Sequence, residues 1–383
     1  MPVITADYIY SPEALLRNYC LETTPEGEVI SLRPISVEDH PMVCKGILLP
    51  GFVNAHCHLE LSALKGHIPR QTGMTAFIGQ VISKRNDFTE ETQIQAVEDA
   101  LRFLWQSGTI AVGDICNTGI SILPKKASPL FTYSFIELLG LGDTRAPEIL
   151  NNGLALSEKF AGLAHSLSPH APYSMSRALI RAIYGQNPQL MSIHLLESKE
   201  ERQLFAENGG PFREFYQKMG IPFAGFEAKD PIAHVLSEVK KSQPMLLVHN
   251  TQMTEQELIA IAQNYPQAWF CLCPGSNLYI HNSFPDLDMF RDNTDRICLG
   301  TDSYASNASI DVFEEVKLIQ EKCPEISLHE VLRWATTHGA AALGKSGVLG
   351  AFIPGTCPGV NLIEGIAETQ AELLPGAVVK KLY

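Results

Sequence analysis

The chain has 383 residues, of which 45% are hydrophobic and 19% are charged, and its formal net charge at pH 7 is −13. This composition is typical of a globular protein, and the acidic balance argues against a nucleic-acid partner, because nucleic-acid binders usually carry a basic surface. No apolar run is long enough to span a membrane, and the N-terminus lacks a secretory pattern. Nine cysteines, an odd number, favour reduced thiols over a disulfide framework. We therefore expect a cytoplasmic globular protein.

Both ends of the chain carry short β-type segments. Residues 1–49 and 345–383 each contain a few short apolar stretches separated by turns, and the second segment is rich in Gly and Pro. Neither has enough apolar residues to form a core alone. We therefore expect the two ends to pair in one small β-sandwich domain, which flanks a larger domain over residues 50–344.

Residues 50–344 alternate apolar strands with amphipathic helical patterns. This alternation predicts an α/β fold, a parallel (β/α)8 TIM-like barrel. A doubly wound sheet would alternate in the same way, but no Gly-rich phosphate-binding loop follows any strand. Ser198 and Thr254 are expected to cap two of the helices. The first strand is expected to end at residues 56–58, and seven further strands are expected at residues 108–114, 130–137, 163–170, 190–197, 244–250, 268–274 and 296–302. Helices are expected between them, at residues 92–106, 175–186, 199–218, 254–264 and 310–322.

Most of these strands end in a reactive side chain. In a parallel barrel the carboxyl ends of the strands meet at one mouth, where active sites form. A single His at a strand end is usually a hydrogen-bonded core group, but in this chain reactive side chains occur at the ends of most of the expected strands. We therefore expect these side chains to converge on one active site: His56, His58, Asp114, Glu137, His170, His194, Glu197, His249 and Asp302.

The first strand ends in two histidines, His56 and His58, which point to one side because alternate residues of a strand face the same way. His194 offers a third nitrogen and Asp302 a carboxylate, a set that suits one Zn²⁺, or alternatively Fe²⁺, with a position left for water. A second metal would need a bridging ligand, commonly Lys, at the end of the fourth strand. Residues 168–170 are Ser-Pro-His, so we expect one divalent metal ion.

Catalytic groups are expected beside this ion. A metal lowers the pKa of bound water towards neutrality, and His249 and Asp302 can orient that water. Glu197, just past its strand, can lean over the metal and carry protons. Small cytidine deaminases share an H-x-E motif with His58–Glu60, but they also need P-C-x-x-C, which the chain lacks.

With these motifs the chain resembles the amidohydrolase superfamily, in the branch of cytosine-deaminase-like and adenosine-type deaminases. The resemblance covers nearly the whole chain, at residues 50–58, 168–174, 194–197, 248–249, 299–303 and 339–344. It implies a metal-dependent hydrolase barrel with these metal ligands: His56, His58, His194 and Asp302. It also implies that Glu197 and His249 handle protons beside Asp302.

The resemblance also bears on the substrate. Residues 168–174 are similar to deaminases of methylthioadenosine and S-adenosylhomocysteine, in which the His contacts the nucleoside, so His170 is assigned to substrate binding. Residues 58–63 look more like 6-aminodeoxyfutalosine deaminases of the menaquinone pathway, which makes Glu60 a candidate substrate contact. Ser303 is assigned to substrate binding as well. The alternatives are structural: His170 could be a hydrogen-bonded residue at a strand end, and Glu60 could form a local salt bridge.

The reaction expected from this resemblance is hydrolytic deamination of a purine-type ring, with 6-aminodeoxyfutalosine as the best guess, by a hydrolase acting on C–N bonds other than peptide bonds. Alternatives with the same residues are deamination of S-adenosylhomocysteine, methylthioadenosine or guanine, and dechlorination of triazine-like rings. A non-catalytic binding protein would have lost metal ligands, and none is lost. Relatives are commonly dimers, which makes a homodimer possible. One departure is Gly275, where relatives often carry Arg.

Overall fold

The computed structural model describes residues 2–367 and 371–383; residue 1 and residues 368–370, which the expected β domain includes, lie outside the described residues. The expected α/β fold with parallel strands is confirmed. Two four-stranded parallel sheets have the orders β11-β10-β9-β8 and β12-β13-β14-β15. Their strands are β8 (Phe52–Cys57), β9 (Thr109–Cys116), β10 (Phe131–Leu138), β11 (Ala164–Pro169), β12 (Met191–Leu195), β13 (Met245–His249), β14 (Ala268–Leu272) and β15 (Ile297–Leu299).

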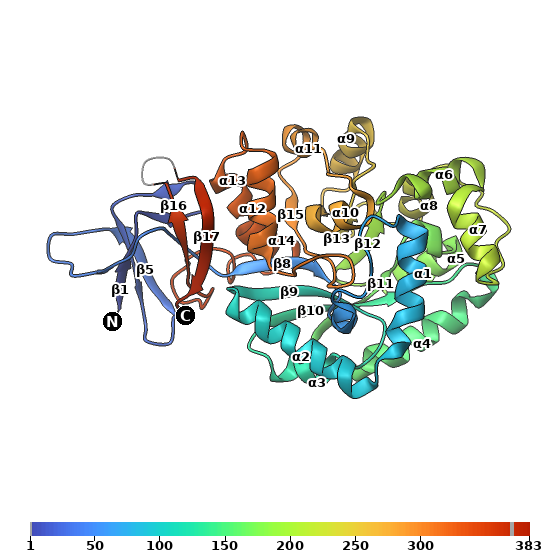
Figure 1. Ribbon diagram of the computed structural model, residues 1–383, viewed down its shortest axis with the longest axis horizontal. Coiled ribbons are helices and arrows are strands. Elements are labelled where there is room, and N and C mark those ends of the chain that lie inside the picture. Colours follow the sequence, from blue (N-terminus) through green and yellow to red (C-terminus); the bar gives the residue numbers. More distant parts are fainter. Residues whose placement is uncertain (1, 368–370) are drawn as a thin grey trace.

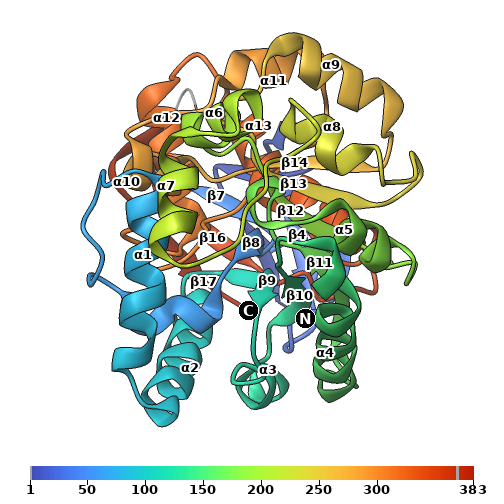
Figure 2. The ribbon, with the colours of Figure 1, turned by 90° about the vertical axis from the view of Figure 1, so that its right-hand side faces the viewer.

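Hydrogen bonds join the two sheets at both edges. At one edge the His194 N–H donates to the His170 carbonyl at 2.9 Å. At the other edge the N–H groups of Thr301 and Asp302 donate to the His56 carbonyl at 3.0 and 3.1 Å. Figure 2, in which the strands lie near the centre, shows the helices arranged around them. The carboxyl ends of β8, β12 and β15 therefore lie near one another.

Side chains of the two sheets alternate between a shared inner core and clusters formed with the surrounding helices. One buried cluster contains Ala111 and Phe135 of the first sheet and Val248 of the second, so the inner faces of both sheets share a core. Residues of the opposite parity, such as Leu247, belong to another cluster that includes helix residues such as Leu258. This alternation follows from the two-residue period of strand side chains.

Helices connect the strands, and the caps expected at Ser198 and Thr254 are confirmed, since each side chain accepts a hydrogen bond from the third residue of its helix. The segment 199–218, expected as one helix, is two helices, because Asn208 adopts a left-handed conformation (φ 52°) after the first. The helices are α1 (Met74–Lys84), α2 (Glu90–Gln106), α3 (Ile122–Ala127), α4 (Ala146–Lys159), α5 (Arg177–Tyr184), α6 (Lys199–Glu207), α7 (Gly210–Lys218), α8 (Pro231–Leu236), α9 (Glu255–Asn264), α10 (Pro274–His281), α11 (Leu287–Asn293), α12 (Val312–Lys322), α13 (Leu328–Arg333) and α14 (Gly339–Ala342).

The two ends of the chain meet in a pair of smaller sheets, with the orders β17-β16-β7-β2-β3 and β5-β4-β1-β6. Ile363 of β16 pairs with Ile47 of β7, so the C-terminal tail adds strands to the N-terminal segment (Figure 1). Their strands are β1 (Val3–Thr5), β2 (Tyr8–Tyr10), β3 (Leu15–Leu16), β4 (Tyr19–Thr23), β5 (Val29–Pro34), β6 (Met42–Val43), β7 (Ile47–Leu49), β16 (Asn361–Ile366) and β17 (Leu373–Lys381).

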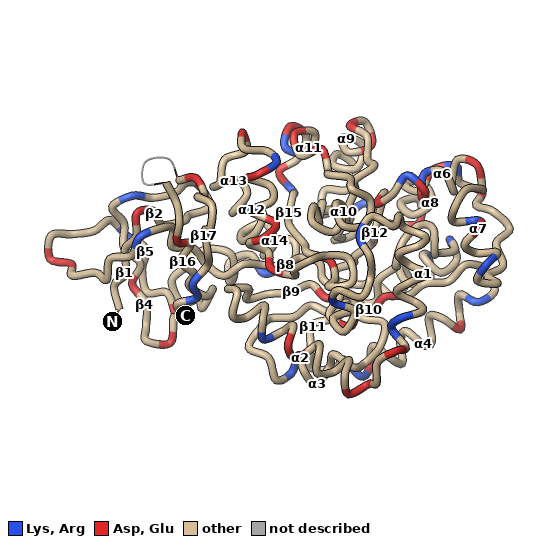
Figure 3. Tube along the Cα trace, in the orientation of Figure 1, with Lys and Arg blue, Asp and Glu red and all other residues tan. Residues whose placement is uncertain are grey.

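Charged side chains of both signs are interspersed along the trace (Figure 3). Within the described residues, no helix has the length and apolar character that a membrane crossing requires.

Candidate active site

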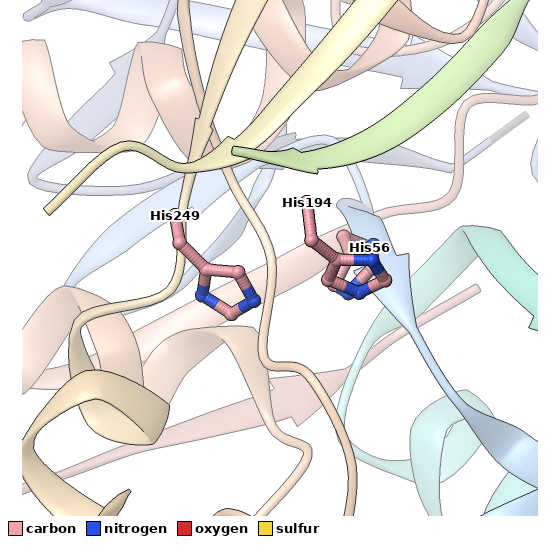
Figure 4. A group of neighbouring side chains, drawn as sticks. All are labelled: His56, His194 and His249. Carbon is pink, nitrogen blue, oxygen red and sulfur yellow. The ribbon is translucent and has the colours of Figure 1, made fainter. Parts of the chain in front are cut away.

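Four predicted metal ligands meet at the carboxyl ends of the strands. His56 and His58 come from the end of β8, His194 from β12, and Asp302 from the segment after β15. His58 Nε2 lies 3.2 Å from His194 Nε2 and 3.4 Å from Asp302 Oδ1, and His56 Nε2 lies 3.7 Å from the same oxygen. In Figure 4 the rings of His56 and His194 lie close together, with His249 beside them. Three imidazoles and one carboxylate are therefore gathered in one place.

The ring nitrogens and the carboxylate oxygen of this group suit coordination of a shared cation better than hydrogen bonding to one another. Both ring nitrogens of His56, a fully buried residue, lack a hydrogen-bond partner among the described residues, as does His249 Nε2. Buried polar atoms are normally paired, because an unpaired one loses its hydration without compensation. Three nitrogens and one oxygen, from His56, His58, His194 and Asp302, lie within a few ångströms of one another and can instead hold one divalent metal ion.

Neighbouring groups orient the potential ligands. His194 Nδ1 lies 2.9 Å from the His170 carbonyl, to which it can only donate, so the neutral ring presents the lone pair of Nε2 to the cluster. Asp302 Oδ2 accepts hydrogen bonds from the hydroxyls of Ser276 and Ser306, each at 2.7 Å, which leaves Oδ1 facing the histidines. Burial alone would raise the pKa of Asp302, but the surrounding histidines hold that pKa well below its usual range.

His249 and Glu197 form an acid–base pair beside the cluster, with Nε2 and Oε1 3.5 Å apart. The amide nitrogen of Asn277, 3.2 Å from His249 Nδ1, can only donate, so the imidazole carries its proton on Nε2, which faces Glu197. Burial, reinforced by the charge of Asp302, raises the pKa of Glu197 well above its usual value. The site therefore favours a protonated Glu197 next to a neutral His249, whose pKa burial lowers.

Comparison with known protein families finds a match over most of the chain. Residues 47–372 match the model of the amidohydrolase family. The chain belongs to the amidohydrolase family. It is therefore an enzyme of a hydrolase family, as the sequence motifs predict.

Named proteins also resemble this amidohydrolase. An adenosine deaminase of Helicobacter pylori is 29% identical over 311 residues, which cover 78% of this chain and 74% of that protein. An aminodeoxyfutalosine deaminase of Nitratiruptor is 26% identical over 372 residues, 91% of this chain and 88% of that protein. The crystal structure of Helicobacter pylori aminofutalosine deaminase in complex with methylthio-coformycin superposes with a TM-score of 0.81 at 25% identity, over 97% of this chain and 95% of that chain.

Two of the residues expected to contact substrate, His170 and Ser303, differ from each other in burial and in hydrogen-bond partners. His170 is half-buried after β11, with Nδ1 2.6 Å from the Ser174 hydroxyl, and burial lowers its pKa to about 4. Ser303 is 1% exposed, and its hydroxyl lies 2.8 Å from that of Ser306 in the turn that holds Asp302. Substrate contact by these residues stays a prediction, since no ligand contact tests it.

Glu60 is the third residue expected to contact substrate. Its carboxylate accepts hydrogen bonds from the backbone N–H groups of Asn117 and Thr118, at 3.1 and 3.0 Å, and the residue is 6% exposed. Protein donors therefore hold this carboxylate against the loop after β9. A direct substrate contact by Glu60 stays a prediction as well.

The expectation that Asp114 joins the site is wrong. Asp114 shares its side of β9 with Val112, which packs among helix residues such as Leu101, so the carboxylate faces the helices. There Oδ1 accepts a hydrogen bond from the Leu59 N–H at 2.7 Å, and Oδ2 lies 2.5 Å from Lys125 Nζ. Glu137, by contrast, does reach the site, beside His194.

Three residues that orient Asp302 and His249 are not predicted from the sequence, namely Ser276, Asn277 and Ser306. Asn277 and Ser276 follow β14 and Ser306 follows Asp302, so their position after strand ends was the available signal. The departure at Gly275 has a steric reason. A Cβ there would lie 2.5 Å from Glu315 Oε1 and 2.7 Å from Asn307 Nδ2, so an Arg would have to displace both side chains.

Proposed function

We propose that this amidohydrolase hydrolytically deaminates an aminopurine-type ring, with 6-aminodeoxyfutalosine of menaquinone biosynthesis as the favoured substrate. The observation that carries the proposal is the acid–base pair of Glu197 and His249, 3.5 Å apart, beside four gathered metal-ligand atoms. The relative and the solved structure named for aminodeoxyfutalosine or aminofutalosine deaminase support the substrate. A relative named adenosine deaminase and one named 5-methylthioadenosine/S-adenosylhomocysteine deaminase make adenosine-type nucleosides the second candidate.

The metal site in this proposal consists of His56, His58, His194 and Asp302, and zinc is the favoured ion, with iron as the alternative. Tightly spaced imidazoles with one carboxylate suit either ion. When bound, such an ion would lower the pKa of a water molecule and make it a nucleophile near neutral pH.

The chain's own residues then manage protons and charge. Glu197, protonated because burial raises its pKa, donates its proton to the ring nitrogen next to the carbon that bears the amino group. His249 Nε2–H, fixed by Asn277, donates a hydrogen bond to the oxygen that adds to that carbon. Asp302 Oδ1 accepts the first proton of the attacking water. Glu197 then takes the proton of the hydroxyl that the ring carbon has gained and passes it to the amino group, which leaves as ammonia, and the proton on Asp302 restores the protonated Glu197.

Substrate contacts and molecular organisation belong to the proposal too. His170, Glu60 and Ser303 are the proposed substrate-binding residues, His170 being the most accessible of the three. We further propose that the two parallel sheets close into one (β/α)8 barrel over residues 50–344, and that residues 1–49 and 345–383 form a small β domain. All nine cysteines are free thiols, which supports a cytoplasmic location.

Ammonia release tests the substrate. The zinc-loaded protein is offered 6-aminodeoxyfutalosine, S-adenosylhomocysteine, adenosine and guanine side by side. We expect the highest kcat/KM with 6-aminodeoxyfutalosine. A preference for S-adenosylhomocysteine or adenosine would select the second candidate, and ammonia from none of them would overturn both.

Glu197→Gln tests the mechanism. The variant keeps the volume and the metal ligands but cannot exchange the carboxyl proton, so we expect unchanged zinc content and kcat lower by about 10²- to 10⁴-fold. Glu207→Gln, on the exposed face of α6, is the matched control and should keep wild-type turnover. Full activity of Glu197→Gln would contradict the assignment.

A further inference from the structure

Glu137 ends β10 inside the site, and none of the steps above uses it. Its side chain lies on the same side of β10 as Tyr133 and Phe135, which belong to the core shared by the two sheets. It therefore faces the inside of the sheets and caps this core at the end where the potential metal ligands gather. The residue is 7% exposed.

The two carboxylate oxygens of Glu137 differ in their partners. Oε2 accepts a hydrogen bond from the side-chain amide of Asn117 at 2.9 Å. Oε1 is buried and has no hydrogen-bond partner among the described residues. His194 Nδ1 lies 3.6 Å from Oε1, too far for a hydrogen bond, and donates to the His170 carbonyl instead. The protein thus leaves one buried acceptor open, which is unfavourable unless a ligand supplies the donor.

The neighbours of this open acceptor indicate where such a ligand would lie. A carboxylate oxygen of Glu137 and ring nitrogens of His170 and His194 all lie within 4.8 Å of one another. The reacting end of the site, with Glu197, His249 and Asp302, is a separate group. A ligand that contacts His170 can therefore also reach Glu137, through atoms other than those that lie beside Glu197, His249 and Asp302.

We propose that Glu137 is a substrate-binding residue that accepts a hydrogen bond from a sugar hydroxyl of a nucleoside, an inference that rests on the proposed function. An N9-substituted aminopurine has N–H donors only on its exocyclic amine, which sits at the reacting carbon. Among the groups of the nucleoside, a donor near His170 must then come from the sugar. Carboxylates bind ribose hydroxyls in this way in dinucleotide-binding proteins.

An orienting role towards His194 would compete with this assignment. The His194 Nδ1–H is already used by the His170 carbonyl, so Glu137 is not needed to fix that ring. A group that only positions the ring would also affect every substrate equally. Discrimination between sugars is therefore the readout that separates the two roles.

The test compares adenosine, 2′-deoxyadenosine and 3′-deoxyadenosine with the zinc-loaded protein, both as substrates and as inhibitors of 6-aminodeoxyfutalosine deamination. We expect the wild type to disfavour at least one deoxy analogue by about tenfold or more, because a buried acceptor then stays unpaired. In Glu137→Ala this ratio should fall towards one, mainly through loss of kcat/KM for adenosine. The isosteric Glu137→Gln, a weaker acceptor that preserves packing, should give an intermediate ratio.

Glu315→Gln is the matched control, since Glu315 is also buried but both of its oxygens accept hydrogen bonds, from the Gly275 N–H and Asn307 Nδ2. It should keep the wild-type ratio. Equal losses on all three nucleosides in the Glu137 variants, or no sugar preference in the wild type, would overturn the sugar contact. If the protein deaminates 6-aminodeoxyfutalosine but none of the three nucleosides inhibits that reaction, only the sugar contact would be overturned. No ammonia from any compound would overturn the proposed function as well.

Discussion

Two residues of this site, His249 and Asp302, have a left-handed backbone conformation. His249 and Asp302 have φ values of 72° and 59°, in the left-handed region that residues with a Cβ rarely adopt. His249 would otherwise face the helices with Leu247, two residues before it on β13, and the left-handed conformation breaks that alternation. Such conformations occur at functional sites because surrounding contacts hold them. Here Asn277 contacts His249, and two serines hold Asp302.

Gly300, between β15 and Asp302, permits a close approach to a potential metal ligand. A Cβ at this position would lie 2.7 Å from His56 Cβ and 2.9 Å from both the His56 carbonyl and Cys271 Sγ. In Gly300→Ala we therefore expect His56 to shift, zinc affinity to fall by about tenfold or more and the free energy of unfolding to fall by roughly 1–3 kcal/mol. Competition with a chelator measures the affinity.

Gly79→Ala, within α1, is the control for this substitution. Its added Cβ would meet only Phe215, at 3.7 Å, and Ala favours the helix, so zinc affinity should stay at the wild-type value. Wild-type affinity in Gly300→Ala would contradict the predicted contact with His56.

At the scale of elements, one buried ion pair joins α3 to the strands. Lys125 of α3 and Asp114 of β9 both have fully buried side chains, and Lys125 also donates to the Ser134 hydroxyl of β10 at 2.8 Å. Burial alone would lower the pKa of Lys125, but Asp114 holds it above its usual range. Because Asp114 also accepts from the Leu59 N–H, the pair anchors the chain directly after His58.

Lys125→Met tests this ion pair. The substitution leaves the Asp114 carboxylate buried without its cation, so we expect the free energy of unfolding to fall by about 3–5 kcal/mol. The double variant Lys125→Met/Asp114→Asn removes both charges and should recover much of that loss. Urea unfolding of the zinc-loaded proteins measures both. An equal or larger loss in the double variant would show that the unpaired charge is not the cause.

At the scale of the whole molecule, the potential metal ligands come from both parallel sheets. His56 belongs to β8 of one sheet and His58 directly follows that strand, whereas His194 belongs to β12 of the other sheet. A bound ion would therefore add a link between the sheets in the native state alone. Ligands that bind only the native state stabilise it in proportion to the logarithm of their concentration.

Zinc at 100 times its dissociation constant should raise the free energy of unfolding by about 2.7 kcal/mol relative to the chelated protein. Thermal or urea unfolding at several zinc concentrations measures this. His194→Ala, which removes the β12 ligand, should show a much smaller zinc-dependent shift. The same zinc-dependent shift in both proteins would show that zinc stabilises the protein by binding elsewhere in the molecule.

The amino-acid sequence by itself determined the alternation of strands and helices, the pairing of its two ends and the set of residues at the strand ends. These features depend on local apolar periodicity and on the rule that parallel strands end at one edge. Tertiary structure alone decided that Asp114 faces Lys125, that α6 stops at Asn208 and that Asn277 orients His249. Each of these depends on a side-chain direction or on the sign of one φ angle. Such choices are set by contacts with residues distant in the chain, or by a single turn, and apolar periodicity carries no information about them.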